Sequence, residues 1–288
     1  MTGMGLYTFA IAPFVEYAFM SRALVAALVL AVGAAPMGVF LMLRRMSLMG
    51  DAISHAILPG AALGYLAFGL ALWPMAMGGL AAGLAVALLS GLVARFSPVR
   101  EDASLAAFYL LSLAAGVVIV SLRGSNLDLM HVLFGSVLAL DDASLIFIAA
   151  ASSLTLVILA LILRPLAMEC ADPLFLRSVG GQGGIIHMVF LALVVINLVA
   201  GFAALGTLLA VGLMMLPAAA ARVWARGLGG MVLAAFLIAA MSAIAGLLLS
   251  FHAGLPAGPA IILVAGVIYL LSLAAAIFRG QPHRHRTA

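Results

Sequence analysis

The sequence predicts an all-α, polytopic integral membrane protein. Of its 288 residues, 67% are hydrophobic and only 8% are charged, and the mean hydropathy is +1.35. Soluble domains are close to half apolar and a quarter charged, so this composition excludes a soluble globular fold. The apolar runs lack the alternation of a membrane β-barrel strand. At roughly 20 residues per span, the length allows about eight or nine transmembrane helices.

The apolar runs predict nine spans, with boundaries that are accurate to a few residues. They cover residues 18–43, 47–70, 73–94, 104–122, 143–163, 185–203, 205–222, 229–250 and 256–278. Acidic pairs at 101–102 and 141–142 begin the fourth and fifth spans, where carboxylates interact favourably with the helix dipole. Almost no polar linker separates 185–203 from 205–222. The alternative is therefore eight spans, with a broken helix in this region.

The arginines predict the orientation of these spans. Eleven lie on one side of the predicted bundle, namely Arg44, Arg45, Arg95, Arg100, Arg164, Arg177, Arg222, Arg226, Arg279, Arg284 and Arg286, and two, Arg22 and Arg123, lie on the other. The positive-inside rule makes the crowded side cytoplasmic. We therefore expect an outer interfacial segment at 1–17, a transmembrane domain at 18–280 and a cytoplasmic basic tail at 281–288.

The chain contains no lysine, because all 13 of its basic residues are arginine. A P-loop uses a lysine to reach the nucleotide phosphates, so the chain lacks a standard nucleotide-binding motif. No predicted cytoplasmic loop is long enough to form a catalytic domain. We expect a non-enzymatic membrane subunit, and any ATP hydrolysis would belong to a partner. The single cysteine, Cys170, excludes an internal disulfide.

Asp51 and His55 are the strongest candidates for a functional site. Their i,i+4 spacing places both side chains on one helical face, and the span position puts His55 roughly 12 Å into the membrane. Ionisable groups at that depth usually face a partner or a cavity. A carboxylate and an imidazole suit Zn²⁺ or Mn²⁺. The alternative is a structural hydrogen bond between the two side chains.

Two ligands are too few for tetrahedral Zn²⁺, whereas a two-fold dimer would supply two Asp51 and two His55 side chains. The following Pro59 and Gly60 predict a helix break beside this site, in the permeation pathway. We expect no permanently bound cofactor, so the metal ion would be cargo.

A short helix is predicted at residues 172–180, on the cytoplasmic side. Asp172 is its N-cap, Pro173 occupies the first turn, and Gly180 ends it in a left-handed conformation. The alternative to a docking element is a plain connector. As a docking element, it would present Leu174, Phe175 and Arg177 to a cytoplasmic partner, since exposed apolar groups often mark a partner surface.

The other histidines give weaker signals. His131 lies in the outer segment 128–135, His187 at the start of the sixth predicted span and His252 at an outer helix end, and we interpret all three as structural rather than as metal ligands. His283 and His285 belong to the basic tail, which fits the positive-inside rule better than a metal site.

The segment from Gly50 to Gly60, preceded by Leu43-Arg44-Arg45-Met46, resembles the permease subunits of zinc-, manganese- and iron-type ABC importers. Weaker matches follow in the same order over about residues 18–280: Arg100-Glu101-Asp102, Leu133 to Ser136, Asp172 to Gly180, Gly206 to Ala221 and Leu255 to Gly258. This resemblance implies a permease bundle in a bacterial inner membrane, working as a homodimer. It also implies two cytoplasmic ATPase subunits and an extracytoplasmic metal-binding protein. Asp51 and His55 would then form the permeation site, and the 172–180 segment would be the coupling helix.

Three functions remain as hypotheses from the sequence. The first is an ATP-driven importer of a divalent metal, with zinc preferred over manganese or iron because two Asp and two His side chains complete a set of four ligands. The second is a secondary cation transporter that uses Asp51 as a proton-coupled group. The third is an ABC permease for an organic ligand, against which the Asp51–His55 pair argues.

Overall fold

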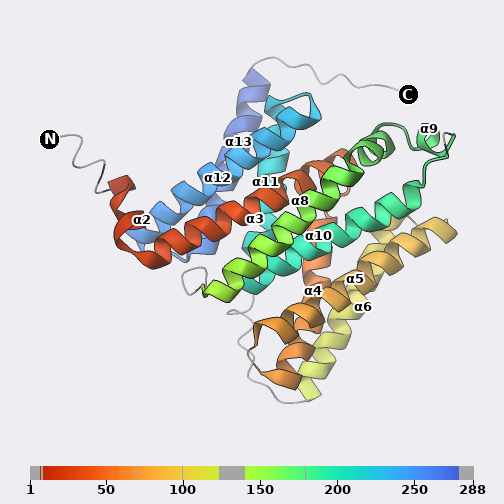
Figure 1. Ribbon diagram of the computed structural model, residues 1–288, viewed down its shortest axis with the longest axis horizontal. Helices are drawn as coiled ribbons and strands as arrows, with labels where there is room; N and C mark the ends of the chain where they lie inside the picture. The colour runs from red at the N-terminus through yellow and green to blue at the C-terminus, as the bar shows by residue number, and fades with distance from the viewer. Residues whose placement is uncertain are drawn as a thin grey trace.

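The structure is a computed structural model that describes residues 7, 9–69, 71–98, 100–122, 140–178 and 180–278. Every regular element over these residues is a helix, which confirms the predicted fold class (Figure 1). The long helices are α3 (Ala18–Leu43), α4 (Met49–Phe68), α5 (Leu72–Phe96), α6 (Glu101–Leu122), α8 (Asp142–Ala171), α10 (Gly183–Leu205), α11 (Thr207–Trp224), α12 (Leu228–Ala253) and α13 (Ala257–Phe278). There are also two short helices. The first, α2 (Ala12–Glu16), precedes α3, and the second, α9 (Pro173–Ser178), connects α8 to α10.

Among the described residues, eight helices are long and apolar enough to cross a membrane. The long helix outside this set is α4, whose sequence includes Asp51 and His55. The count over the described residues agrees with the alternative of eight spans rather than with nine, because α4 is not in the set, but the broken helix expected at 185–222 is wrong. The region 185–222 forms two separate helices, α10 and α11, and both qualify as spans. Gly206 alone separates them, and its φ of +91° is a conformation that glycine adopts without strain.

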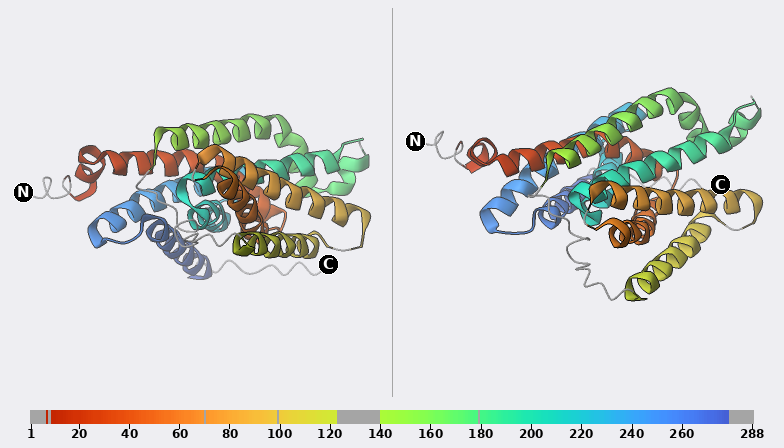
Figure 2. Two further views of the ribbon diagram at one scale, coloured as in Figure 1. Left: turned by 90° about the horizontal axis from the view of Figure 1, so that it is seen from below. Right: turned by 60° about the horizontal axis from the view of Figure 1, so that its bottom comes forward.

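Ionic contacts distinguish the two ends of the bundle. At one end, the Arg22 side chain near the start of α3 lies 3.1 Å from the carboxylate of Asp142 at the start of α8. At the other end, Arg44 just beyond α3 pairs with Glu169 near the end of α8 at 2.7 Å. These two pairs show that α3 and α8 run in the same direction. Figures 1 and 2 show α2 and α9 at opposite extremes of the elongated bundle.

Small residues allow the helices to approach closely, as is usual in membrane bundles. In α4, Gly60 lies against Gly78 and Ala82 of α5, where an added Cβ would come within 2.6 Å of the Ala82 Cβ. The contact between Gly60 and Gly78 means that α4 and α5 pack backbone to backbone rather than through large side chains. Helices α3 and α8 also approach closely, since an added Cβ at Gly33 of α3 would lie 2.9 Å from the hydroxyl of Ser152 in α8.

The helix ends largely follow the sequence signals. Asp141 is the N-cap of α8, and its carboxylate accepts a hydrogen bond of 2.9 Å from the amide of Ser144. Hydrogen bonds from the Ser144 side chain, which contributes most, and from this amide lower the pKa of the Asp141 carboxyl. At the N-terminal end, α2 falls within the segment expected at the outer interface. The domain limits at 17 and 280 stay predictions, and the tail at 281–288 lies outside the described residues.

Candidate metal centre

The first half of α4 has one uncovered stripe. From Met49 to Ala61, the residues that are not buried are Asp51, His55 and Leu58. Their spacing of four and then three residues puts them on a single helical face. The remaining residues of this stretch pack against the rest of the bundle, with α5 and α6 as the main neighbours. The sequence prediction that Asp51 and His55 share one face is therefore confirmed.

The contacts of α4 show how deep this stripe lies. The Ser112 hydroxyl of α6 donates to the carbonyl of Ala56 at 3.3 Å, and Ser112 is about 16 Å along α6 from Glu101. On the other side, an added Cβ at Gly83 of α5 would lie 3.0 Å from the Ile57 side chain. Both contacts join α4 to interior turns of long apolar helices. The Asp51–His55 pair is thus beside the membrane-spanning part of the bundle.

The two side chains are close without being hydrogen-bonded. The His55 Nε2 atom lies 3.7 Å from the Asp51 Oδ1 atom, beyond the usual 2.7–3.2 Å range. Two metal–ligand bonds of about 2.1 Å can span this separation. The Asp51 side chain is 66% exposed and that of His55 is 39% exposed. The His55 ring also stacks on Tyr109 of α6 at a centroid distance of 6.2 Å.

Within the described residues, no group of three or more His, Cys, Asp or Glu side chains is placed to hold a metal ion. Over the part of the chain that the structure describes, Asp51 and His55 therefore form an incomplete ligand set in one chain. This agrees with the sequence argument that one copy supplies too few ligands for a metal.

The helix break predicted at Pro59 and Gly60 is wrong. Helix α4 continues through both residues to Phe68. The reason is packing, because Pro59 lies against Gly116 of α6 and Gly60 against α5, and these neighbours hold the backbone helical. The chemical effect of the proline persists, however. Since proline has no N–H group, the carbonyl of His55 lacks the donor that residue 59 would normally provide.

The predicted short helix between α8 and α10 is present as α9. The Asp172 carboxylate accepts a hydrogen bond of 3.0 Å from the Phe175 amide, as expected for an N-cap. Gly180 has a φ of +77°, and the next amide, from Gly181, donates to the Leu176 carbonyl at 2.8 Å. Phe175 is 53% exposed, whereas Leu176 is buried at 4% exposure. Sequence reasoning missed Leu176, the side chain that anchors α9.

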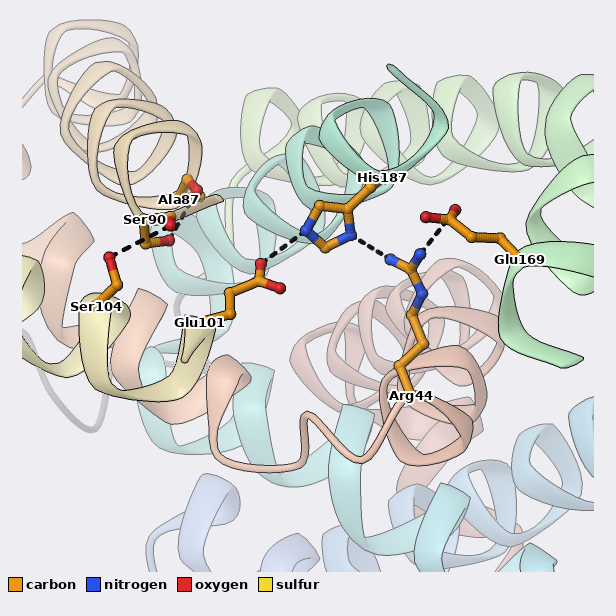
Figure 3. Close-up of polar contacts among 7 residues, drawn as sticks. All are labelled: Arg44, Ala87, Ser90, Glu101, Ser104, Glu169 and His187. Carbon is orange, nitrogen blue, oxygen red and sulfur yellow. Dashed lines mark hydrogen bonds and ion pairs between the residues drawn. The ribbon is translucent and has the colours of Figure 1, made fainter. Parts of the chain in front are cut away.

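Sequence reasoning also missed a polar network at the α9 end of the bundle (Figure 3). Arg44 contacts Glu169 of α8 at 2.7 Å and also the Nδ1 atom of His187 in α10. The Nε2 atom of His187 lies 2.7 Å from the carboxylate of Glu101 in α6. A cavity of about 530 Å³ adjoins the network and is lined also by Arg45 and Arg95. These residues are far apart in sequence, so no local motif indicated the network.

The remaining histidines have different surroundings. His187 belongs to this network. His252 lies at the opposite end, where its ring stacks on Phe9 at 4.2 Å and its Nε2 atom contacts the Phe9 carbonyl at 3.0 Å. His131, His283 and His285 lie outside the described residues, as does the Leu133 to Ser136 motif.

Comparison with known proteins places this architecture in a family. Residues 16–276 match the ABC 3 transport family. The manganese import system permease protein ScaB of Streptococcus parasanguinis is 32% identical over 257 residues, covering 89% of this chain and 90% of ScaB. The chelated iron transport system membrane protein YfeD of Yersinia pestis is also 32% identical over 257 residues, covering 89% of this chain and 85% of YfeD.

A solved structure gives the same assignment. PsaBC from Streptococcus pneumoniae, in complex with Fab, matches with a TM-score of 0.79 and 29% identity over 91% of this chain and 94% of the other. The helices that cross the membrane and the likeness to these permeases identify a multi-pass plasma-membrane protein. The chain belongs to the ABC 3 transport family and is the membrane permease subunit of a metal importer of the ABC type.

Proposed function

We propose that this permease conducts a divalent metal ion, manganese or ferrous iron, through a site that contains Asp51 and His55. The observation that carries the proposal is the uncovered stripe on α4, where a carboxylate and an imidazole lie 3.7 Å apart beside membrane-spanning helices. A charged group there is costly unless it faces a partner or a conducted ion.

The choice of metal differs from the sequence expectation of zinc. The relatives described above are named for manganese and iron, and these names support the manganese or iron alternative. The zinc preference rested on counting four ligands, and that count omits backbone and water oxygens. Pro59 lacks the N–H group that would normally bind the His55 carbonyl, and we propose that this oxygen contributes to the site. Oxygen ligands favour Mn²⁺, which commonly takes six.

A second copy of the chain would complete the site. The Asp51 carboxylate is 66% exposed, and lipid is an unfavourable neighbour for it. A two-fold axis beside this stripe would cover both side chains and bring two Asp51 and two His55 residues together. The exposed face of α6 next to the stripe, with Leu110 at 54% and Leu111 at 66% exposure, offers apolar surface for the same contact.

The energy would come from separate ATPase subunits, since this chain has no lysine for a P-loop. The α9 end carries Arg44, Arg45, Arg95 and Arg222, so the positive-inside rule makes it cytoplasmic. We assign α9 as the segment that contacts the ATPase, with Asp172, Pro173 and Gly180 shaping it and Leu174, Phe175 and Arg177 on it. A metal-binding protein would deliver the ion at the opposite face.

The test is uptake of radioactive Mn²⁺ by cells that express the permease with its ATPase and binding protein. Asp51→Asn and His55→Gln should each lower uptake at least tenfold while membrane insertion is retained. Asp102→Asn is the matched control, because Asp102 is an exposed carboxylate that lies 3.6 Å from Arg100 and outside the stripe on α4. Normal uptake by both site variants would exclude this site. Uptake of Zn²⁺ that manganese and iron do not compete with would exclude the metal assignment.

The dimer needs its own measurement. Leu58→Cys on a Cys170→Ser background places one thiol on the stripe. A short bis-maleimide should cross-link two chains in native membranes. An exposed thiol on α12, Leu237→Cys, should give no dimer. Equal cross-linking at both positions would contradict a specific contact through the stripe.

A further inference from the structure

The network at the α9 end joins four helix ends through a continuous chain of polar contacts. Arg44 bridges Glu169 and His187, and His187 in turn contacts Glu101 (Figure 3). We infer that this network, which we call the Arg44 relay, transmits movement of α9 to α4, with Arg44 and His187 as positioning residues for the metal site. The inference rests on the proposed function, since that function gives α9 and α4 their roles.

The relay holds α9 from both sides. Glu169 lies in the last turn of α8, just before α9, and His187 lies in the second turn of α10, just after it. Arg44 contacts both side chains, so a single guanidinium connects the residues that lie on the two sides of α9. A displacement of α9 that moves the end of α8 or the start of α10 must therefore move Arg44 or break a buried contact.

Arg44 is directly connected to the helix that carries the metal site. It is the C-cap of α3, and a four-residue turn leads from it to Met49 at the start of α4. That turn is compact, since Arg45 has a φ of +60° and Met46 is 8% exposed. Asp51 lies in the first turn of α4. A shift of Arg44 therefore reaches Asp51 through a short connection, in which Met46 is the buried residue.

The second arm of the relay reaches the same helix through α6. A guanidinium has only donors, so the Nδ1 atom of His187 must accept from Arg44. The other ring nitrogen, Nε2, then donates to Glu101 at the start of α6. Further along α6, Tyr109 stacks on His55 and Ser112 binds the carbonyl of Ala56. Both arms therefore end on the stretch of α4 that holds the site.

The surroundings favour a moving element over a fixed structural pair. The Arg44 side chain is 9% exposed and that of Glu169 is 14% exposed, so both charges are largely removed from water. Such buried ion pairs are often no more stabilising than apolar residues of similar size. The adjoining cavity of about 530 Å³ gives these side chains room to rearrange. Arg95 lies at its edge against Gly184, the second residue of α10.

The test compares two substitutions of His187 in the permease–ATPase complex reconstituted into liposomes with Mn²⁺. Gln can accept from Arg44 and donate to Glu101, so His187→Gln should keep the relay, whereas His187→Leu removes both contacts. We expect His187→Leu to lower the metal transported per ATP hydrolysed about tenfold, within the 5–150-fold range of typical coupling. His187→Gln should stay near the wild-type ratio, as should His252→Leu at the opposite end of the bundle.

A second variant keeps the inference testable if His187→Leu fails to assemble. Arg44→Lys keeps the charge but replaces the planar fork with a single ammonium, which is a poor bridge between Glu169 and His187. It should also lower the transport ratio. A wild-type ratio in either His187→Leu or Arg44→Lys would overturn the relay, as would equal losses in the Gln and Leu variants. Failure of the wild-type complex to move any metal would instead refute the proposed function.

Discussion

Replacing Gly60 by alanine tests how closely α4 must pack on α5. An added Cβ would lie 2.6 Å from the Ala82 Cβ and 2.7 Å from the Gly78 carbonyl carbon. Normal carbon contacts are about 3.5–4.0 Å, so the two helices must separate by about 1 Å. A gap of that size removes up to about half of each contact's 0.1–0.2 kcal/mol. Over roughly 50 atom pairs, the number made by one buried leucine, this amounts to about 3 kcal/mol.

Alanine also has a better helix propensity than glycine, by about 1 kcal/mol, so the net loss should be about 2 kcal/mol. The assay is equilibrium unfolding of the purified permease in mixed detergent micelles with increasing SDS. Gly266→Ala in α13 is the matched control, because no atom lies within 4 Å of an added Cβ there. It should leave stability unchanged or raise it by up to about 1 kcal/mol. Equal stabilities of the Gly60→Ala and Gly266→Ala variants would refute the packing argument.

Three further predictions concern a cap, the orientation and the ATPase contact. Because the pKa of Asp141 is lowered in the folded state, its cap stabilises α8 above about pH 4, and this stabilisation is lost as the pH falls below that value. In unfolding titrations, Asp141→Asn should remove this acid dependence, whereas Asp141→Ala should lower the free energy of unfolding by about 1 kcal/mol at pH 7. Ser178→Cys on a Cys170→Ser background should react with an impermeant maleimide only from the cytoplasmic side, and labelling from outside would reverse the orientation. Phe175→Ala should weaken binding of the ATPase by about 2 kcal/mol, seen as reduced co-purification, or lower the metal transported per ATP, while metal affinity is unchanged. If the variant retains both ATPase binding and the transport ratio, α9 is only a connector.

The fold was largely predictable because long apolar runs determine where helices cross a membrane. The predicted runs correspond to the nine long helices of the described residues, and α9 formed where Asp172 and Gly180 indicated its ends. The prediction of a break at Pro59 was wrong because a proline signal is local, whereas the packing of α5 and α6 against a continuous α4 is not.

The candidate site was predictable only in part. Asp51 and His55 are four residues apart, so helical periodicity was enough to place them together. The Arg44 relay joins residues separated by 86 to 143 positions, and two of them had a sufficient local explanation. Arg44 satisfied the positive-inside rule, and Glu101 began a helix. Sequence patterns within one helix thus found the metal pair, while contacts between helices needed the structure.

The single glycine between α10 and α11 restricts how these two helices can separate. Leu205 and Thr207 are two Cα steps apart, so their Cα atoms can never be more than about 7 Å apart. The end of α10 and the start of α11 therefore stay close together at Gly206 in every conformation of the chain. Any widening between them is one-sided and increases toward the end where α10 bears His187 and α11 bears Arg222. Val211 and Met215 of α11 lie next to Gly50 in the first turn of α4. Such a widening would therefore displace that turn, while α10 and α11 stay together at Gly206.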